Sequence, residues 1–367
     1  MISEVYFTNM TSNNPNDSLL LKLERLYERT GFSFLISEND KVAIKTHFGE
    51  IGNTGYIQPQ YARKIVDALK KLNSKPFLTD TNTLYHAKRD NSVDHLETAT
   101  KHGFTYSVIN APVIIADGLT GCSDVEVEIN KKLFNKVKIA KDIYDSDAMI
   151  VISHVKGHIL AGFGGALKNL AMGCASRRGK IHQHKIAAPF ISKIACLACN
   201  VCIDACPENA ITVDTYAHIN YEKCIGCNDC IGACPKNAIK LNKINSEEFI
   251  ESMMEYAYGS VKDKDDKVLY INFLTDIAPD CDCNPYSDRP IVRDIGILAS
   301  YDPVAIDKAS YDLINKELGL IDSALESNHE EGADKFKGVW RNIDGHMQID
   351  FAQQLNMGTK DYKIVEI

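Results

Sequence analysis

Two copies of one cysteine pattern constrain the fold of this chain more than any other feature of its sequence. Each copy has three cysteines at intervals of three positions and a fourth after four more, followed by proline, and the copies are 28 residues apart. Three thiolates so spaced can bind three corners of an iron–sulfur cubane, while the fourth reaches the neighbouring cluster. The pattern therefore predicts two [4Fe–4S] clusters. One would be held by Cys196, Cys199, Cys202 and Cys234, and the other by Cys224, Cys227, Cys230 and Cys206.

Structural zinc is the alternative, because pairs of cysteines separated by two residues also build zinc sites. Two complete copies of the pattern favour iron–sulfur clusters. The tails Cys206–Ile211 and Cys234–Ile239 match as well, and over residues 190–243 the chain closely resembles the bacterial two-cluster ferredoxin family. Small residues between the cysteines, among them Ala198 and Gly226, let backbone N–H groups approach the cluster sulfides.

The cysteine pattern and the overall charge also limit the compartment and the partners. Clustered thiols in a chain without a visible signal peptide indicate metal or redox chemistry in a reducing compartment, so we expect a cytoplasmic protein of an anaerobic organism. The formal net charge of −8 offers no broad basic surface for nucleic acid, and no apolar stretch is long enough to span a membrane. We therefore expect a redox partner protein or a low-potential electron donor, with no nucleic acid and no membrane as partner.

Strand-like and helix-like stretches alternate on both sides of the cysteine-rich stretch. Strands are predicted at residues 41–45, 76–80, 106–109, 148–153 and 267–273, and helices at 58–73, 94–102 and 302–317. The alternation predicts an α/β fold with a mostly parallel sheet. Because both flanks keep it, we interpret residues 189–243 as a small α+β ferredoxin-like insert in a discontinuous α/β domain, residues 1–188 and 244–367, rather than as a module appended at one terminus.

Candidate site residues follow the strand predicted at 148–153. His154, Lys156 and His158 come at its carboxyl end, where open α/β sheets bind ligands. Three glycines then allow the backbone to approach a cofactor closely; they are Gly162, Gly164 and Gly165. They lead into a predicted helix that contains Lys168 and whose N–H groups could hold an anion. We expect a cofactor or a small anionic substrate here, although a glycine run can also be a plain turn.

Two further stretches add candidates at this edge of the sheet. The basic residues 177–185 could bind a carboxylate or phosphate through Arg177 and Arg178, with His182 or His184 as a ligand. A solvated basic loop is the alternative for this stretch. His47 follows the strand predicted at 41–45 and could act as a base or a metal ligand, or could be a hydrogen-bonded residue near the surface.

The remaining cysteines fall into two groups. Cys281 and Cys283 alternate with aspartates after the strand predicted at 267–273, so this element could line the site, bind a metal or supply reactive thiols. Cys122 and Cys174 have no partner by spacing, and we expect both to be small buried residues. Asp302 is expected to cap the helix predicted at 302–317.

Several of these motifs occur together in one known family. Residues 154–173, the element at 280–283 and the helix start at 302–307, with the cysteine-rich stretch between them, resemble the family called domain of unknown function 362 over most of the chain. Members of that family commonly carry a two-cluster ferredoxin module. The resemblance implies the fold and the clusters but no reaction.

A shorter stretch of 27 residues resembles the core of nickel-pincer lactate racemases. His158 stands ten residues before Lys168, and His184 stands sixteen residues after it, with a glycine-rich run between. The resemblance implies that His158 is an acid/base, that Lys168 anchors the nickel-pincer nucleotide and that His184 binds nickel. That family's N-terminal Asp-x-Thr-Arg element is not evident in this chain, and a racemase needs no ferredoxin.

Three functions remain open from the sequence. The leading one is an iron–sulfur oxidoreductase that passes electrons to a substrate or a second cofactor at the strand ends, where His47, His158 and Lys168 supply protons or orient charge. The second is a non-catalytic ferredoxin-type electron carrier or scaffold, although most of the 367 residues lie outside the ferredoxin-like stretch. The third is a racemase-like enzyme with a nickel-pincer cofactor.

Overall fold

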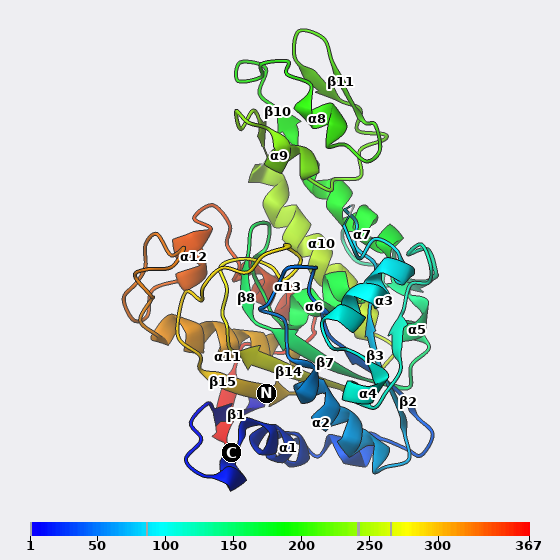
Figure 1. Ribbon diagram of the computed structural model, residues 1–367, viewed down its shortest axis with the longest axis vertical. Coiled ribbons are helices and arrows are strands. Elements are labelled where there is room, and N and C mark those ends of the chain that lie inside the picture. The colour runs from blue at the N-terminus through cyan, green and yellow to red at the C-terminus, as the bar shows by residue number, and fades with distance from the viewer. Residues whose placement is uncertain (1, 86, 241–242, 265) are drawn as a thin grey trace.

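The computed structural model describes residues 2–85, 87–240, 243–264 and 266–367, and one eight-stranded sheet forms its centre (Figure 1). The strands lie in the order β16 (Tyr362–Glu366), β1 (Ser3–Asn9), β15 (Gly296–Ser300), β14 (Val268–Leu274), β7 (Ala148–His154), β2 (Lys41–Lys45), β3 (Lys75–Asp80) and β4 (Val113–Ile115). Strand β15 runs antiparallel to both of its neighbours, and every other pair in this sheet is parallel. The predicted α/β fold with a mostly parallel sheet is confirmed.

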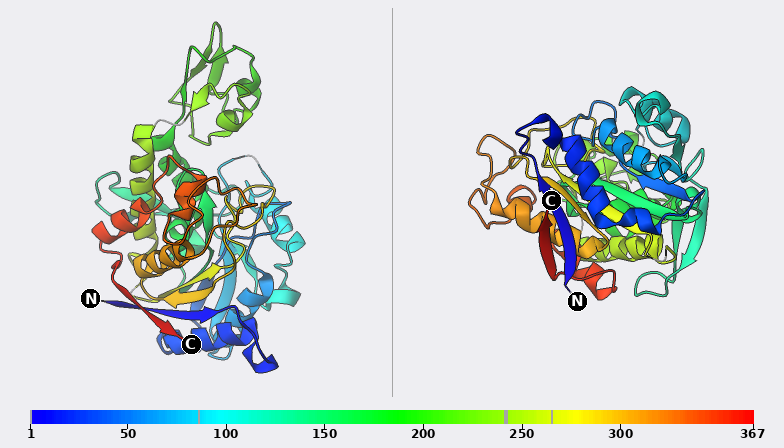
Figure 2. Two further views of the ribbon diagram at one scale, coloured as in Figure 1. Left: turned by 90° about the vertical axis from the view of Figure 1, so that its left-hand side faces the viewer. Right: turned by 90° about the horizontal axis from the view of Figure 1, so that it is seen from below.

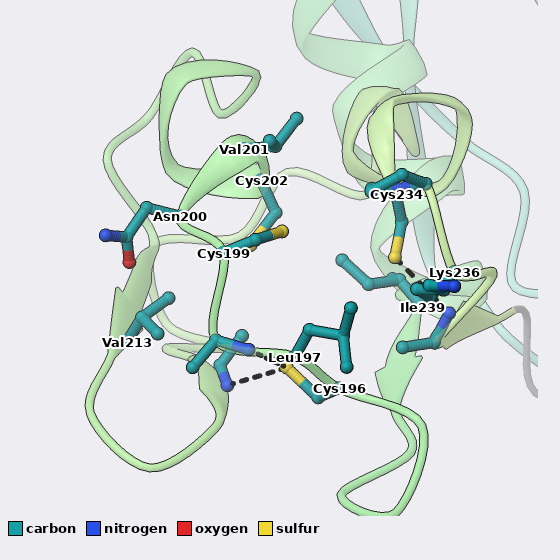
Figure 3. Close-up of a pocket in the computed structure, with 14 residues that line it drawn as sticks. Cys196, Leu197, Cys199, Asn200, Val201, Cys202, Val213, Cys234, Lys236 and Ile239 are labelled. Carbon is teal, nitrogen blue, oxygen red and sulfur yellow. Dashed lines mark hydrogen bonds between the residues drawn. The ribbon is translucent and has the colours of Figure 1, made fainter.

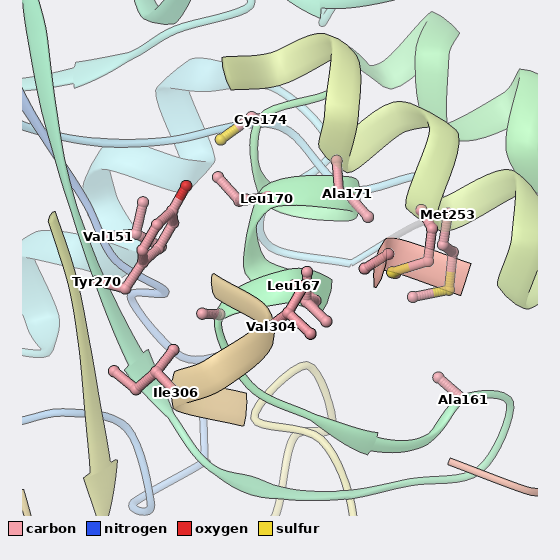
Figure 4. Close-up of a cluster of buried hydrophobic side chains, with 14 of the residues drawn as sticks. Val151, Ala161, Leu167, Leu170, Ala171, Cys174, Met253, Tyr270, Val304 and Ile306 are labelled. Atoms are coloured by element: carbon pink, nitrogen blue, oxygen red, sulfur yellow. The ribbon is translucent and has the colours of Figure 1, made fainter. Parts of the chain in front are cut away.

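Helices cover both faces of the sheet because successive side chains of a strand point to opposite faces. The first face carries α1 (Leu19–Thr30), α2 (Pro59–Lys70) and α3 (Ser92–Lys101), and the second carries α6 (Ala166–Gly173), α10 (Lys243–Val261), α11 (Pro303–Lys316) and α13 (Met347–Gln354). Along β7, Ile152 joins the core under the first face and Val151 joins the other core. Figure 4 shows the second core, in which Val151 lies with Leu167 of α6 and Val304 of α11.

Shorter elements connect the strands. They are α4 (Tyr106–Ile109), the hairpin β5 (Asp124–Glu128) and β6 (Lys136–Ala140), α5 (Lys141–Tyr144), the hairpin β8 (Lys156–His158) and β9 (Gly162–Gly164), α7 (Arg177–His184), α12 (Lys335–Val339), and 3-10 turns at Pro15–Asp17, Phe32–Leu35 and Lys185–Ala187. Within the described ranges, no helix is both long enough and apolar enough to cross a lipid bilayer.

One local prediction from the sequence is wrong, and one alternative that the sequence left open is excluded. Residues 106–109 form the short helix α4 rather than a strand, and Asn110 ends its single turn in the left-handed region at φ 58°. The basic stretch at 177–185 is largely helix α7 rather than a loop, because the Ser176 hydroxyl accepts a hydrogen bond from the Gly179 N–H at 3.0 Å and caps it. The predicted cap of α11 is confirmed, since Asp302 accepts from the Val304 N–H at 2.9 Å.

The cysteine-rich segment forms a small lobe at one end of the molecule, far from both termini (Figures 1 and 2). Its elements are β10 (Phe190–Ile191), α8 (Val201–Asp204), β11 (Ile211–Val213), β12 (Ala217–Ile219), α9 (Asp229–Ala233) and β13 (Ile239–Lys240). The entering strand β10 pairs with the leaving strand β13, and the lobe has its own apolar cluster. The division into domains at 188/189 and 243/244 stays a prediction, and Leu241 and Asn242 beside the second boundary lie outside the described residues.

A buried carboxylate fixes the start of α6. Asp307, on α11, accepts hydrogen bonds from the backbone N–H groups of Ala166 at 2.8 Å and Leu167 at 2.9 Å, and from the Asn272 side chain at 2.8 Å. A Cβ on Gly165 would lie 2.4 Å from an Asp307 oxygen, so only glycine fits there. The sequence suggests that N–H groups at the start of this helix could hold an external anion. In the structure, the Asp307 carboxylate accepts hydrogen bonds from two of them.

Removing the Asp307 carboxylate should destabilise the fold. In Asp307→Ala, two buried backbone N–H groups and the Asn272 amide lose their acceptor, and we expect the free energy of unfolding to fall by about 3 kcal/mol. Denaturant titration followed by circular dichroism measures this loss. Lys316→Ala, on the exposed side of the same helix, should change stability by less than about 0.5 kcal/mol. Equal stabilities of the two variants would contradict this role of Asp307.

The same carboxyl group should make stability depend on pH. Burial raises the pKa of Asp307 to about 6, from an ordinary value of 3.8. The folded state therefore binds the proton more tightly than the unfolded state, so the contribution of this group to stability falls as pH rises through that interval. Unfolding curves measured between pH 4 and 7 should show this fall for the wild type relative to Asp307→Asn, and parallel pH profiles would refute it.

Candidate functional site

A cavity of about 780 Å³ lies at the carboxyl ends of the parallel strands. The segments that follow β2, β3, β7 and β14 all contribute to its wall, because parallel neighbouring strands end at the same edge of a sheet. Helices α6, α7 and α10 line it as well, and so does the cysteine-rich lobe through residues 227–229, 231 and 232. The cavity thus borders both the large sheet and the lobe.

The cavity wall is positively charged although the whole chain is acidic. Six lysine and arginine side chains line it against three carboxylates. Some of these cations have buried partners: Lys45 pairs with Asp80 at 3.0 Å, and Arg89 contacts Glu50 at 3.2 Å. For Lys168 Nζ, the nearest polar contact found among the described residues is the sulfur of Cys281 at 3.8 Å. A wall of this charge favours an anionic ligand.

Asp282 holds the loop after β14 against the end of β7. Its buried carboxylate accepts hydrogen bonds from His154 Nδ1 at 3.0 Å and from Lys156 Nζ at 2.6 Å. These two residues were predicted to stand at the site, and both line the cavity. Burial raises the pKa of Asp282, but the charges of His154 and Lys156 hold it well below its ordinary value. The ion pair therefore fixes the position of the neighbouring Cys281 and Cys283.

His158, Cys281 and Cys283 come together at the cavity wall. Their imidazole and sulfur atoms all lie within 4.8 Å of one another, close enough to share an ion. Burial and the nearby Lys168 charge lower the pKa of His158. The sequence proposed these residues in two separate stretches, His158 in the stretch after β7 and the two cysteines in the element at 280–283, and the fold brings them together.

His47 lines the same cavity but is held as a neutral ring. Its two ring nitrogens face the Gly49 backbone N–H at 2.9 Å and the Arg89 guanidinium at 3.1 Å, and both of these groups are donors. Burial, with the Arg89 charge next, holds the pKa of His47 well below its ordinary value. The ring is therefore suited to positioning Arg89, and it holds a proton poorly at neutral pH.

His184 lies at the end of α7, between the cavity and the lobe. Burial lowers its pKa to about 4, and Phe249 packs against its ring edge-on at 5.1 Å between ring centroids. Its Nδ1 atom is buried and meets no hydrogen-bond partner among the described residues. His182 instead contacts the Tyr256 hydroxyl at 3.0 Å and is absent from the cavity lining. Of the two candidate histidines, the structure thus brings only His184 to the cavity.

The glycines and arginines of the predicted cofactor site separate in the structure. Gly164 and Gly165 line the cavity, whereas Gly162 adopts φ +74° against the backbone of Gly345. The Arg177 guanidinium donates to the carbonyl groups of Thr83 and Leu84, both at 3.2 Å. The Arg178 guanidinium makes two hydrogen bonds to Asp124, at 2.8 and 2.9 Å. Both arginines are absent from the cavity lining, because these carbonyls and this carboxylate hold them elsewhere.

In the lobe, one small cavity is lined by the first predicted set of cysteines (Figure 3). These are Cys196, Cys199, Cys202 and Cys234. Backbone N–H groups surround the thiols: Ala217 donates to the sulfur of Cys196 at 3.4 Å, and Ala238 donates to that of Cys234 at 3.3 Å. Donors in this position stabilise negative charge on sulfur.

A second small cavity is lined by the other set, Cys206, Cys224, Cys227 and Cys230. The duplication is visible in the backbone, since Ala198 and Gly226, one repeat apart, both have positive φ, at 52° and 71°. Cys227 lines this cavity and the large central cavity as well. The two isolated cysteines differ: Cys174 is buried as predicted, but Cys122 is exposed, which corrects that prediction.

Some residues of the cavity were missed in the sequence. Tyr85 and Arg89 line it from the segment after β3, and Arg89 donates to the Tyr85 hydroxyl at 3.1 Å. Of the basic stretch 177–185, which the sequence did offer, Lys180 reaches the cavity from α7, and burial lowers its pKa to about 8. The sequence could have indicated Tyr85 and Arg89, because both follow the strand predicted at 76–80, as His47 and His154 follow theirs.

Neutralising Asp282 should destabilise the cavity wall. In Asp282→Asn, the buried Lys156 ammonium loses its counter-charge, and we expect a loss of about 3 kcal/mol in the free energy of unfolding. The double variant Asp282→Asn/Lys156→Gln should recover part of this loss, because it removes the unpaired Lys156 charge together with the carboxylate. Asp288→Asn, an exposed change nearby, serves as the matched control in denaturant titrations. A double variant as unstable as the sum of its single variants would contradict the pairing.

Two solved structures are similar to this chain at low sequence identity. The lactate racemase apoprotein from Thermoanaerobacterium thermosaccharolyticum shares 13% sequence identity at a TM-score of 0.35, covering 75% of this chain and 51% of its own. A protein from Thermotoga maritima shares 10% identity at a TM-score of 0.36, covering 94% of this chain and 60% of its own. This chain thus spans about half the length of the racemase, and TM-scores this low do not establish a common fold. No sequence among the curated proteins matches it.

A family model does match most of the chain. The model describes a domain of unknown function, DUF362, and it covers residues 42–312, from strand β2 to helix α11 and across the cysteine-rich lobe. This is the family that the motifs in the sequence resemble. The chain belongs to the DUF362 family.

Proposed function

We propose that this protein is an iron–sulfur oxidoreductase whose lobe holds two [4Fe–4S] clusters and whose central cavity binds a small anionic substrate or a second cofactor. The observation that carries the proposal is the place of Cys227, which lines both the second cysteine cavity and the central cavity. Bound clusters would supply electrons one at a time. The electron source would be a low-potential donor or a redox partner protein.

The donor sets in the lobe fit this assignment. Each small cavity is lined by four thiols, three from one repeat and one from the other, as the spacing requires for a pair of cubanes. Backbone N–H groups already point at three of these sulfurs, those of Cys196, Cys206 and Cys234, at 3.2–3.4 Å. A four-thiol zinc site in each cavity remains the alternative that metal analysis decides.

The part of the cavity beside the lobe carries free polar atoms. The side-chain oxygen and nitrogen of Asn228 are buried and meet no hydrogen-bond partner among the described residues, and the same holds for His184 Nδ1. All belong to side chains that line the cavity. Buried polar groups cost free energy unless they are paired, so a bound polar ligand next to the second cysteine set would satisfy them.

The groups around that ligand have distinct roles in this proposal. Lys168 would orient an anionic group, because it has no carboxylate partner among the described residues. His158 would hold or transfer a proton. His47 would position Arg89 rather than transfer protons, for the reasons of burial and charge given above.

Two other functions are separable by what they bind. A plain electron carrier would not need a positively charged cavity next to its second cluster. A racemase-like enzyme with a nickel-pincer cofactor is favoured by one observation, that His158, Lys168 and His184 all line a single cavity. That function requires nickel and does not explain the eight cysteines of the lobe.

Metal analysis of anaerobically purified protein tests the proposal. We expect about eight iron atoms per chain and no nickel or zinc. Cys199→Ser and Cys227→Ser should each lose about half of the iron, because each removes a ligand from a different set. Iron, nickel and zinc are measured by mass spectrometry on the same samples.

The exposed Cys122 provides the matched control. Cys122→Ser should retain all of the iron, since it belongs to neither set. Zinc in place of iron would contradict the cluster assignment. About one nickel per chain, lost in His184→Ala, would favour the racemase-like function instead.

A further inference from the structure

Two cysteines in the wall of the central cavity have no part in the proposed clusters. Cys281 and Cys283 lie in the loop that Asp282 holds at the end of β7, and both line the cavity. Their sulfur atoms lie within 4.8 Å of each other. Cys227 of the lobe borders the same cavity.

The surroundings make the two sulfurs unequal. Cys281 Sγ accepts a hydrogen bond from the Cys283 backbone N–H at 3.4 Å and lies 3.8 Å from Lys168 Nζ. The Cys283 thiol donates to it as well, and this bond, with the Lys168 charge, holds the pKa of Cys281 well below that of an ordinary thiol. The same bond, with burial, raises the pKa of Cys283. A backbone N–H and a lysine ammonium both face Cys281 Sγ, so a thiolate is better stabilised at Cys281 than at Cys283.

The hydrogen bonds of His158 favour a thiol site over a metal site. Its Nδ1 accepts from the backbone N–H groups of Leu160 and Ala161, both at 3.1 Å. Nδ1 therefore carries no proton, and the neutral ring keeps its proton on Nε2, the nitrogen left to donate to Cys281. A metal ion bound through Nε2 would require the proton on Nδ1, against two backbone donors.

We propose that Cys281 and Cys283 form a redox-active dithiol that reduces a small anionic disulfide bound in the central cavity. Two sulfurs in one short loop suit disulfide exchange, because the second thiol can release the first from a mixed disulfide. The positive wall selects an anionic substrate. An anionic disulfide would be the substrate class of the proposed oxidoreductase. Only the supply of electrons that reduces the dithiol again rests on the proposed function.

The exchange balances as two displacements. The Cys281 thiolate attacks one sulfur of the substrate, the substrate S–S bond breaks, and one substrate thiolate leaves with the electron pair. Cys283 then gives up its proton and attacks Cys281 Sγ, which breaks the mixed disulfide and releases the second substrate thiolate.

The products account for every electron and proton. The proton from Cys283 passes to one of the two released thiolates, and His158 stands where it can relay that proton. The substrate gains two electrons, and the two cysteines are left as a disulfide. Two electrons from a low-potential donor and one proton restore the thiolate and the thiol.

The test compares two small disulfides of opposite charge on the anaerobic holoprotein. A Cys122→Ser background removes the exposed thiol that belongs to neither cysteine set of the lobe. The probes are 3,3′-dithiodipropionate, an anion, and cystamine, a cation of similar length. Intact mass and peptide mapping should show a Cys281–Cys283 disulfide and two released thiols per chain with the anion, and reaction about tenfold slower with the cation.

Variants separate the roles of the two sulfurs. In Cys283→Ser the reaction should stop at a mixed disulfide on Cys281, whereas in Cys281→Ser neither product should form. Lys168→Met should slow the reaction of Cys281 with the anionic probe about tenfold, and the exposed Lys316→Met should leave it unchanged. Circular dichroism checks that each variant is folded.

Several results would overturn the inference. Equal reactivity of Cys281 and Cys283, no internal disulfide, or faster reaction with cystamine would each contradict it. A zinc or nickel ion lost in both Cys281→Ser and His158→Ala would make these residues metal ligands instead. Iron is measured in the same samples. Disulfide exchange in a protein without iron would refute the clusters but not the dithiol. A protein that contains iron but shows no exchange would refute the dithiol but not the clusters.

Discussion

Four parallel strands that end at one edge of the sheet position the central cavity and several of its candidate groups. Strands β2, β3, β7 and β14 bring His47, Asp80, His154 and the Cys281–Cys283 loop to a common border. In an open α/β sheet, a crevice lies beyond the carboxyl ends of the strands. Here the segments that connect the strands and the lobe enclose that crevice. The cavity is therefore a consequence of topology, and its chemistry is set by the residues that follow each strand.

Two buried carboxylates, those of Asp282 and Asp307, fix the segments that line this edge of the sheet. Asp282 ties the cysteine loop to the end of β7 through His154 and to β8 through Lys156. Asp307 ties the start of α6, which carries Lys168, to helix α11. Each carboxylate is surrounded by donors, which is the condition under which a buried charge is tolerated. Because Lys168 and Cys281 are each positioned by such a contact, their separation is fixed by the fold rather than by their own weak attraction.

Short-range patterns in the sequence were sufficient for the fold class and for part of the cavity wall. The cysteine spacing specifies its two sets within the lobe, and the strands before His47 and His154 are evident from their apolar runs. The strand predicted at 106–109 and the loop left open at 177–185 are both largely helical, and local caps at Asn110 and Ser176 stabilise these helices. Long-range contacts could not be predicted either: Asp307 reaches Ala166 across 141 positions, and Arg178 turns away from the cavity to Asp124.

The central claim of the proposal is that a cluster held by the Cys227 set would lie close enough to the central cavity to interact with it electrostatically. A spectroelectrochemical titration of the wild type and Lys168→Met, following both clusters by electron paramagnetic resonance, tests it most directly. Removing a positive charge from the cavity should lower the reduction potential of the cluster at the Cys227 set and leave that of the Cys199 set unchanged. Two unchanged potentials, or equal shifts of both, would contradict the account.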